Sequence, residues 1–495
     1  MDCRLLALLL LCHCRHGWTD EEVTDDGKIP LMPLIPLMAS KPIEDLGTLP
    51  TAGPSPSPES TSQCDLWTQE MAIGGVPDGT EQTTAPREST SEEEADGLCA
   101  EVSGSALKEA IGNGIMKLGL ELMEKLPTGP EQPNVIISPL SLSLALSQLA
   151  LGAVNETQQL LLEHLHAEAL PCYHTALRSL LYHLQKSNIQ IATRMYTQQG
   201  FEPKKDFAQM SQEMYGSEPE VFAGIKEVNE WVEKATNGQV TDFLTSLPPN
   251  LVLMLLNAVH YKGKWQTRFD PRHTASDLFY IDNKHIVNVE MMVEPKYPLQ
   301  LLILNELDAQ VARLPFRDQM SLLIVLPMSG QVNVTDIAAK LNTSDLYARF
   351  PKERSMQVRL PKFKLEYGQE LEEALTSIGL GELFAGPNLA GISDSPLRVS
   401  SVQHKTSMEI TEDGAEAAAA TSISISRSNP TFSVNQPFFF ALMDDTTLTP
   451  VFLGVVTNPN SEAPSMVQAP GRPDKMGFPV IKDKLFADSN GHPPK

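Results

Sequence analysis

The segment from Glu412 to Ser428 constrains the fold more than any other part of the chain, because it alternates like a β-strand yet has almost no bulk. Successive side chains of an extended segment point to opposite faces. One face would carry Ala415, Ala417, Ala419, Thr421, Ile423 and Ile425, and the other would carry Glu416, Ala418, Ala420, Ser422, Ser424 and Ser426. No residue from Gly414 to Ala420 is large enough to anchor a core. The pattern predicts a loop with two states, one of which is a strand in a sheet.

An alanine-rich helix is the competing interpretation, because alanine has the highest helix propensity. Thr421 to Ser426 instead alternates serines with β-branched residues, which favour extended chain. The segment alone leaves the two interpretations about equally supported. The residues that follow favour the extended form. The runs Phe432–Thr447 and Pro450–Pro459 are apolar on both sides of an Asp-Asp-Thr-Thr turn, and they predict a buried hairpin.

Several further motifs occur in a fixed order between Asn134 and Pro459. They are Asn134–Ser141, Asn229–Gly238, Asn257–Trp265, Phe269–Pro271, Arg359–Phe363 and His404, followed by the hairpin. Together these motifs resemble the serpin family. The resemblance implies an α+β fold with a large central β-sheet, two further sheets, about nine helices and an exposed reactive loop over residues 412–431. Amphipathic stretches at Ser105–Lys125 and Leu140–Gly152 and a β-rich run at Ser321–Pro327 agree with this class.

The resemblance also implies how such a loop acts. A trypsin-like protease has an acidic specificity pocket that accepts arginine, so the predicted reactive bond is Arg427–Ser428. After cleavage, the strand Ala415–Ser426 would enter the central sheet and carry the attached protease with it. The hinge of this movement is predicted at Gly414, Ala415, Glu416, Ala417, Ala418, Ala419 and Ala420. Its small side chains offer little resistance, and Gly414 adds backbone freedom.

One spacing departs from the usual serpin pattern. The scissile residue of serpins lies fourteen positions after the hinge glycine, which here is Ser428, whereas Arg427 lies thirteen after. Plasmin-inhibiting serpins share this shortening, so Arg427 remains the predicted site for a trypsin-like enzyme. A protease that prefers small side chains would select Ser428 instead.

By the same resemblance, four polar residues map to a shutter where the central sheet parts. They are Ser138, Ser141, Asn257 and His404. Buried polar groups that pair with one another fit a gate with two hydrogen-bonding arrangements. Simple satisfaction of a buried histidine is an equally supported alternative.

Catalysis finds no support in the sequence. It has no Gly-x-Ser-x-Gly elbow, no His-Glu-x-x-His motif and no glycine-rich phosphate loop. No cysteine or histidine pair has the spacing of metal ligands, so we expect no metal and no cofactor. The sequence therefore predicts a protease inhibitor and not an enzyme.

Charge excludes some partners. The net charge is -24, and residues 18–97 alone hold 17 acidic and 3 basic residues, or -14. This excess argues against nucleic acid and anionic membranes. The resemblance implies a monomer whose partners are plasmin or plasminogen, other trypsin-like serine proteases, and fibrin. Two alternatives are open. The target could be another trypsin-like blood protease, or the chain could be a non-inhibitory serpin that acts as a carrier or signalling ligand.

The chain divides into four zones. Residues 1–17 resemble a signal peptide, since the apolar run after Arg4 is too short to span a membrane. Residues 18–98 form an acidic arm rich in proline, serine and threonine, which predicts disorder. The serpin domain is predicted at 99–458 and a lysine-bearing tail at 459–495. A secreted, extracellular protein is expected, and the sequons at Asn155, Asn333 and Asn342 are its candidate glycosylation sites.

Three cysteines remain after the signal peptide: Cys64, Cys99 and Cys172. A Cys99–Cys172 bond would tie the arm to the domain, and it matches the pattern of plasmin-inhibiting serpins. Cys64 is then left as a free, capped or intermolecularly bonded thiol.

The tail predicts a second contact with plasmin. Gly477–Phe486 is similar to the extension of plasmin-inhibiting serpins, whereas most serpins end near Pro459. A kringle lysine site binds an ammonium and a carboxylate, and a C-terminal lysine supplies both. The predicted kringle-binding residues are Lys475, Lys482, Lys484 and Lys495. Gln63, Gln69 and Gln82 leave open whether a transglutaminase crosslinks the arm to fibrin.

Overall fold

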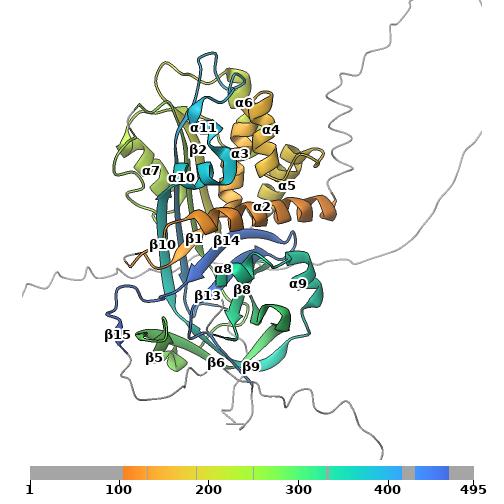
Figure 1. The fold of residues 1–495 in the computed structure, drawn as a ribbon, viewed down its shortest axis with the longest axis vertical. Coiled ribbons are helices and arrows are strands. Elements are labelled where there is room, and N and C mark those ends of the chain that lie inside the picture. The colour runs from red at the N-terminus through yellow and green to blue at the C-terminus, as the bar shows by residue number, and fades with distance from the viewer. Residues whose placement is uncertain are drawn as a thin grey trace, which may run out of the picture. The chain divides into compact units, whose positions relative to one another are not determined.

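The computed structural model describes residues 104–467, except 131, 186, 249, 330–333 and 415–429. This part of the chain contains ten α-helices and fifteen β-strands. In Figure 1 the helices α3 to α6 lie above α2, and the strands β5, β6, β8 and β9 lie below it. The predicted α+β class is confirmed.

The first sheet has five strands and contains the pair of strands on which the function depends. Its order is β10 (Phe363–Glu370), β11 (Val399–Ile410), β4 (Leu253–Lys262), β2 (Ile189–Thr197) and β3 (Glu220–Val221). β11 and β4 run parallel, as do β2 and β3, whereas β10 with β11 and β4 with β2 are antiparallel. Strands β11, β4 and β2 are therefore the central strands, and β10 and the two-residue β3 are the edges.

Both faces of β4 are covered, so nine of its ten residues are buried. Leu253, Leu255 and Val259 join the main core, while Met254 and Leu256 join a second core that includes Val228 and Val232 of α7 (Ile225–Ala235). Because strand side chains alternate, odd-numbered residues of β4 face the main core and even-numbered residues face the α7 side. We call these the inner and the outer face of the five-stranded sheet.

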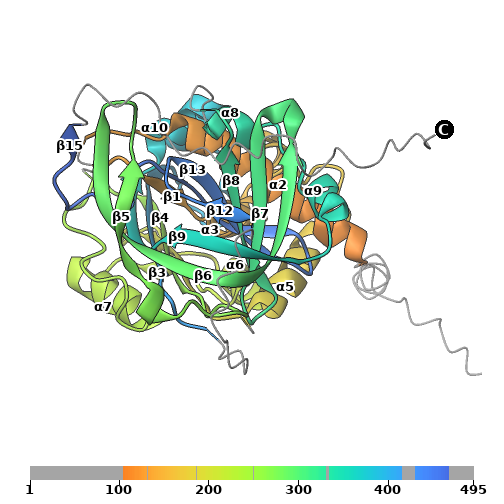
Figure 2. The ribbon, with the colours of Figure 1, turned by 90° about the horizontal axis from the view of Figure 1, so that it is seen from below.

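The other ten strands form two sheets that share β6 (His285–Leu304), which is 20 residues long. Its Gln300–Leu304 part pairs with β7, and its Met291–Leu299 part pairs with β9. Figure 2 shows β6 running from β5 to β7. The predicted central sheet with two further sheets is therefore confirmed. The remaining bounds are β1 (Val135–Ile137), β5 (Ala275–Tyr280), β7 (Ala309–Pro315), β8 (Met320–Pro327), β9 (Arg354–Pro361), β12 (Thr431–Ser433), β13 (Phe438–Asp444), β14 (Thr449–Val456) and β15 (Met466–Val467).

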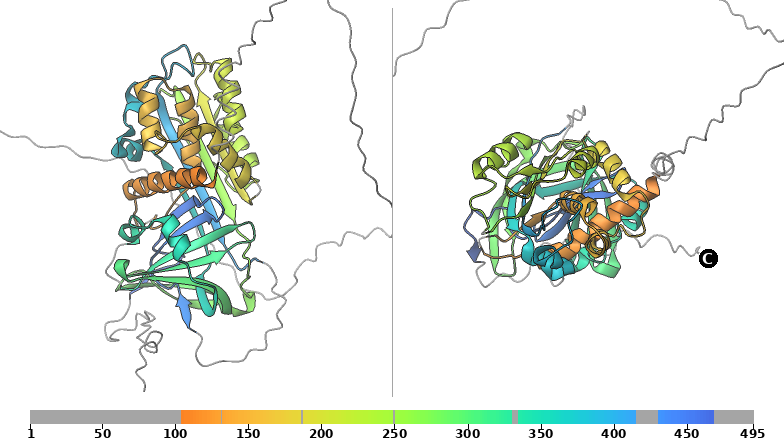
Figure 3. Two further views of the ribbon diagram at one scale, coloured as in Figure 1. Left: turned by 90° about the vertical axis from the view of Figure 1, so that its right-hand side faces the viewer. Right: turned by 90° about the horizontal axis from the view of Figure 1, so that it is seen from above.

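Helix α3 (Pro139–Gly152) lies inside the molecule and packs against β2, β4 and β14. Thirteen of its fourteen residues are buried, so it has no face exposed to solvent. Proline at its first position and the Ser138 cap, which accepts from Ser141 N, fix its start. Figure 3 shows α2 (Ser105–Lys125) crossing beside it. The other helices are α4 (Glu156–His164), α5 (Tyr173–Leu184), α6 (Lys205–Tyr215), α8 (Val334–Ala338), α9 (Thr343–Arg349), α10 (Glu372–Leu375) and α11 (Glu382–Ala385).

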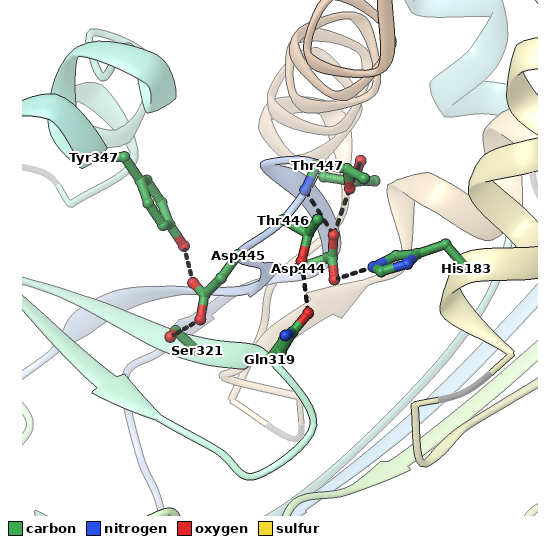
Figure 4. Close-up of polar contacts among 9 residues, drawn as sticks. His183, Gln319, Ser321, Tyr347, Asp444, Asp445, Thr446 and Thr447 are labelled. Carbon is green, nitrogen blue, oxygen red and sulfur yellow. Dashed lines mark hydrogen bonds and ion pairs between the residues drawn. The ribbon is translucent and has the colours of Figure 1, made fainter. Parts of the chain in front are cut away.

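The predicted hairpin is confirmed as β13 and β14, which pair antiparallel. Its turn is held by two adjacent aspartates with different partners (Figure 4). The buried Asp444 accepts from the backbone N–H and hydroxyl of Thr447 at 2.8 and 2.6 Å, and it lies 3.2 Å from His183 on α5. Asp445 accepts from Ser321 and Tyr347 instead. The turn thereby connects the hairpin to a helix on one side and to β8 and α9 on the other.

Within the residues described, no helix is both long and apolar enough to cross a membrane. The same residues contain no group of three or more histidine, cysteine or acidic side chains arranged to hold a metal ion.

Candidate functional site

The candidate site begins with the parallel ladder between β4 and β11, which we call the seam. Ten register pairs connect the strands, from Leu253 with Val399 to Lys262 with Glu409. The two strands are direct hydrogen-bonded neighbours although about 140 residues separate them in sequence. Their chain directions are parallel, so a chain leaving β11 at Ile410 and turning back between them would be antiparallel to both.

The base of the reactive loop is held by one buried tryptophan. The indole N–H of Trp265 donates to the backbone oxygen of Thr411 at 2.7 Å, and its backbone N–H donates to that of Asp413 at 2.9 Å. The indole is stacked on Phe316 with ring centroids 4.2 Å apart. The chain just after β11 is thus fixed to the segment just after β4, at the end of the seam from which the loop departs.

Gly414 fits this position because there is no room for a side chain. A Cβ there would lie 2.7 Å from the backbone oxygen of Trp265 and 2.9 Å from Cα of Arg268. Contacts that short do not occur between unbonded atoms of these types, so a larger residue would displace the backbone. The glycine predicted from its flexibility therefore has a second role, which is close packing against the Trp265 segment.

Glu412 adds a polar anchor at the same place. Its carboxylate accepts from the Thr274 hydroxyl at 2.8 Å and lies 3.4 Å from Nζ of Lys362. Burial by itself would raise the pKa of Glu412, but hydrogen bonds from its own backbone and from Thr274, together with the Lys362 charge, outweigh burial and lower it. The carboxylate is therefore ionised at neutral pH and joins the loop base to Thr274, just before β5, and to Lys362, between β9 and β10.

Three of the four predicted shutter residues meet in the core. His404 of β11 accepts a hydrogen bond at Nε2 from the backbone N–H of Ser138 at 3.1 Å. The Ser141 hydroxyl donates to the Ser138 oxygen at 3.1 Å, and Ser141 N donates to the Ser138 hydroxyl at 3.4 Å. Burial lowers the pKa of His404 to about 4, so the ring is neutral at physiological pH and can accept. This contact joins β11 to the start of α3.

Asn257 lies opposite His404 in the seam, but the two side chains do not bond to each other. Both amide atoms of Asn257 and Nδ1 of His404 are buried and have no hydrogen-bond partner in the described structure. An unsatisfied buried amide costs about 1–3 kcal/mol. The seam thus holds polar groups at its centre that the five-stranded sheet leaves unpaired.

Many predicted residues lie outside the described part of the chain. These are the reactive bond Arg427–Ser428, the hinge residues Ala415, Glu416, Ala417, Ala418, Ala419 and Ala420, the lysines Lys475, Lys482, Lys484 and Lys495, Cys99 and Asn333. Cys172 is disulfide-bonded. Every other cysteine of the sequence lies outside the described residues, so its pairing with Cys99 stays a prediction.

The two described sequons are exposed. Asn155 immediately precedes α4 and has a positive φ of 55°. Asn342 caps α9 with its side-chain oxygen, which accepts from Asp345 N at 2.9 Å. That cap does not use Nδ2, the atom to which a glycan would be attached. Both positions are therefore compatible with the predicted glycosylation.

Sequence reasoning did not identify Trp265, Thr274 and Lys362 as parts of the loop base. Trp265 ends one of the motifs that carry the family resemblance, but the motif gives no indication that this tryptophan holds the loop base. Thr274 and Lys362 reach Glu412 from residues 138 and 50 positions away in sequence. Spacing along the chain holds no signal for such contacts.

Comparisons with known proteins agree with this geometry. A family model described as "Serpin (serine protease inhibitor)" matches residues 113–459. The chain is 40% identical to alpha-2-antiplasmin of Bos taurus over 389 residues, covering 77% of this chain and 78% of the relative. It is 30% identical to plasma protease C1 inhibitor of Homo sapiens over 382 residues, covering 74% of each. Mouse protein-Z dependent protease inhibitor is similar in structure, with a TM-score of 0.63 at 25% identity, covering 72% of this chain and 99% of that one.

Proposed function

The chain belongs to the serpin family, and from that premise we propose that it is a suicide-substrate inhibitor of trypsin-like serine proteases, plasmin among them. Attack at Arg427–Ser428 would form an acyl-enzyme, in which the protease stays attached to the new end of the loop. The freed strand Ala415–Ser426 would then enter the five-stranded sheet before the acyl bond is hydrolysed.

The observation that carries this proposal is the seam. β4 and β11 are parallel neighbours, and the loop leaves from the end of β11 at which Trp265 holds Gly414. A strand that folds back between them replaces one parallel ladder by two antiparallel ones, and antiparallel pairing is slightly more stable per residue. Twelve loop residues extend over about 40 Å, enough to run the length of a ten-residue strand.

The shutter supports the same proposal. Inserting a strand separates His404 from Asn257, and it brings backbone N–H and C=O groups beside the buried polar atoms that now lack partners. New partners for these groups would favour the six-stranded sheet. Parting would not by itself break the His404–Ser138 hydrogen bond, because Ser138 lies beneath the sheet and not across the seam.

Incubation with plasmin tests the proposal directly. We expect a complex that survives denaturing electrophoresis, with Arg427→Ala abolishing it and the matched control Ser424→Ala leaving it intact. A protease that prefers small side chains should still form complexes with Arg427→Ala, at Ser428. If the wild-type chain is only cleaved or left intact, the chain is a non-inhibitory serpin and the proposal is wrong.

Plasmin is proposed as a principal target because of the relatives and the tail. Alpha-2-antiplasmin is named for antiplasmin activity, and residues 459–495 bear Lys475, Lys482, Lys484 and Lys495. A tail bound to a kringle would raise the effective concentration of plasmin at the reactive loop. Through plasmin the chain would limit fibrinolysis.

The tail is tested by removing Lys495. We expect the association rate with intact plasmin to fall about ten-fold, because the second binding contact is lost. Plasmin reduced to its protease domain is the control, since it has no kringles and should react equally fast with both proteins. Equal rates with intact plasmin would contradict the kringle contact without touching the reactive-loop proposal.

We propose that the protein is secreted. The apolar run at residues 5–12 supports a signal peptide, and one relative is named a plasma protein. Expression in mammalian cells should place the protein in the medium, with residues 1–17 absent from its N-terminus. Glycosidase treatment should reduce its mass if Asn155, Asn333 or Asn342 is modified.

A further inference from the structure

A row of alternating charges crosses three strands on the outer face of the five-stranded sheet, at the loop end of the seam. Lys262 of β4 lies opposite Glu409 of β11, which in turn lies opposite Lys364 of β10. Nζ of Lys262 is 3.0 Å from Oε2 of Glu409. Lys364 interacts most closely with Glu366 of its own strand, at 2.5 Å, and Glu366 followed by Glu409 raises its pKa. Glu409 therefore lies between two lysines, one on each neighbouring strand.

These two neighbours differ in what happens when a strand enters the sheet. Neighbouring strands lie about 4.8 Å apart, so insertion would move β4 to about 9.6 Å from β11. The 3.0 Å Lys262–Glu409 contact would be broken in its present geometry, and the two side chains could meet again only by extending over the inserted strand. β10 and β11 do not part, so Lys364 would stay beside Glu409. Of the two lysines beside Glu409, only Lys262 therefore opposes opening of the seam.

Within the described ladder no other side-chain ion pair or hydrogen bond joins β4 to β11 at this end. Just past the strand ends, the Trp265 indole also joins the two segments through its hydrogen bond to the Thr411 oxygen. On the inner face, Tyr261 and Met408 flank the same position with apolar contacts, and further along His404 and Asn257 make no bond to each other. His260 lies two residues before Lys262 on the same outer face, and burial lowers its pKa, so it adds no positive charge near neutral pH. The ion pair is thus placed where the loop would begin to enter.

We propose that the Lys262–Glu409 ion pair is an electrostatic latch that slows parting of β4 from β11 at the loop end. The latch rests on the proposed function, because it matters only if a strand enters the seam. The latch lengthens the lifetime of the five-stranded sheet before cleavage. It thereby lowers the rate at which the uncleaved loop, or the loop of another copy, enters the seam.

The size of the effect follows from exposure. The Lys262 and Glu409 side chains are 43% and 27% exposed, so water screens much of their attraction. Ion pairs of this kind change equilibria and rates by about two- to five-fold. At 1 M salt the Debye length falls to about 3 Å, so the latch should contribute little there.

The test measures seam opening without a protease. A fluorescent peptide with the sequence of residues 415–426 is added to the full-length protein, and its rate of stable uptake is followed at low and high salt. Lys262→Met removes the ammonium and keeps the apolar stem. Lys364→Met is the matched control, because it makes the same charge change on the same face beside Glu409, across a strand pair that does not part.

We expect Lys262→Met to take up the peptide two- to five-fold faster than wild type at low salt, and Lys364→Met to match wild type. The difference should vanish at 1 M salt. Exchanging the two charges, as Lys262→Glu with Glu409→Lys, should restore the wild-type rate, whereas Lys262→Glu alone should be faster still. A variant that was merely misfolded would show neither the salt dependence nor the rescue.

Two negative results are distinguishable. Equal uptake by wild type, Lys262→Met and Lys364→Met, all with cooperative melting, would overturn the latch and leave the proposed function standing. Failure of the wild-type protein to take up peptide even near its unfolding temperature would mean that the seam does not accept a strand. That result would overturn both the latch and the proposed insertion mechanism.

Discussion

At the residue scale, the neutral ring of His404 connects the seam to α3, because its Nε2 accepts from the backbone N–H of Ser138. Burial lowers the pKa of His404 from 6.5 to about 4 in the folded protein. As the pH falls below 6.5 the unfolded chain therefore binds a proton first. The ring's contribution to stability is complete above pH 6.5 and is lost progressively as the pH falls toward 4.

This linkage predicts a loss of about 2 kcal/mol from His404 between pH 8 and pH 5. His174 shares the direction and the window, because burial also lowers its pKa to about 4, so a variant is needed to separate them. The midpoint of thermal unfolding at a fixed scan rate should fall less with pH in His404→Gln than in wild type. Parallel curves for wild type and His404→Gln would show that His404 is not the group that titrates.

The fit of Gly414 gives a second prediction at this scale. In Gly414→Ala, the new Cβ would lie 2.7 Å from the Trp265 oxygen, so the bond from Trp265 N to Asp413 would be strained or broken. Overpacking of this kind costs about 1–3 kcal/mol. The melting midpoint should fall and the fluorescence of the buried Trp265 should change. Gly368→Ala is the control, because its Cβ would meet only Lys405 side-chain atoms at 3.6 Å or more.

At the element scale, the two faces of the loop strand should tolerate charge differently. Inserted residues with the parity of Ala417 would face the core, whereas those with the parity of Ala418 would face the α7 side. An unpaired charge in a core costs several kcal/mol. Ala417→Arg should therefore be cleaved by plasmin with little complex formed, while Ala418→Arg should still trap the enzyme. The ratio of complex to cleaved chain on denaturing gels measures this, and equal ratios would contradict the predicted face assignment.

Elements with a strong local signal were predicted well from sequence. The helix at Ser105–Lys125 agrees with α2 at both ends, and the run Ser321–Pro327 starts one residue inside β8. The hairpin of β13 and β14 was recognised from two apolar runs around a polar turn. In each case the residues that determine the element are neighbours in the chain, so periodicity and turn residues suffice.

Parts of the site were not predictable, for a physical reason. The Glu412 anchor, the stacking of Trp265 on Phe316 and the Lys262–Glu409 pair each join segments distant in sequence. The shutter was located only through the family resemblance, and the lack of a partner for the Asn257 amide was not foreseen. Local propensity gives no information on which strands become neighbours, and the parallel seam is a property of the assembled sheet.

At the scale of the whole molecule, the proposal requires that the five-stranded form stores free energy. The structure offers two sources for it. One is the seam, where a parallel ladder of ten register pairs stands in place of two antiparallel ladders. The other is the set of buried polar atoms of Asn257 and His404 that the closed sheet leaves unpaired. Both sources would be removed when the loop strand fills the seam.

Cleavage at Arg427 should therefore stabilise the protein, although breaking a chain ordinarily does not. About ten new ladder hydrogen bonds at roughly 1 kcal/mol each are comparable to the whole stability of a typical domain. Protein nicked in the reactive loop by a catalytic amount of a metalloprotease, which forms no acyl-enzyme and so cannot be trapped, should melt well above intact protein in a scan at a fixed rate, once mass spectrometry has verified the cut. Nicked Ala417→Arg is the matched control. Its loop strand should not enter the five-stranded sheet, so its melting midpoint should equal that of intact Ala417→Arg. Coincident melting curves of nicked and intact wild-type protein would mean that no free energy is stored in the seam.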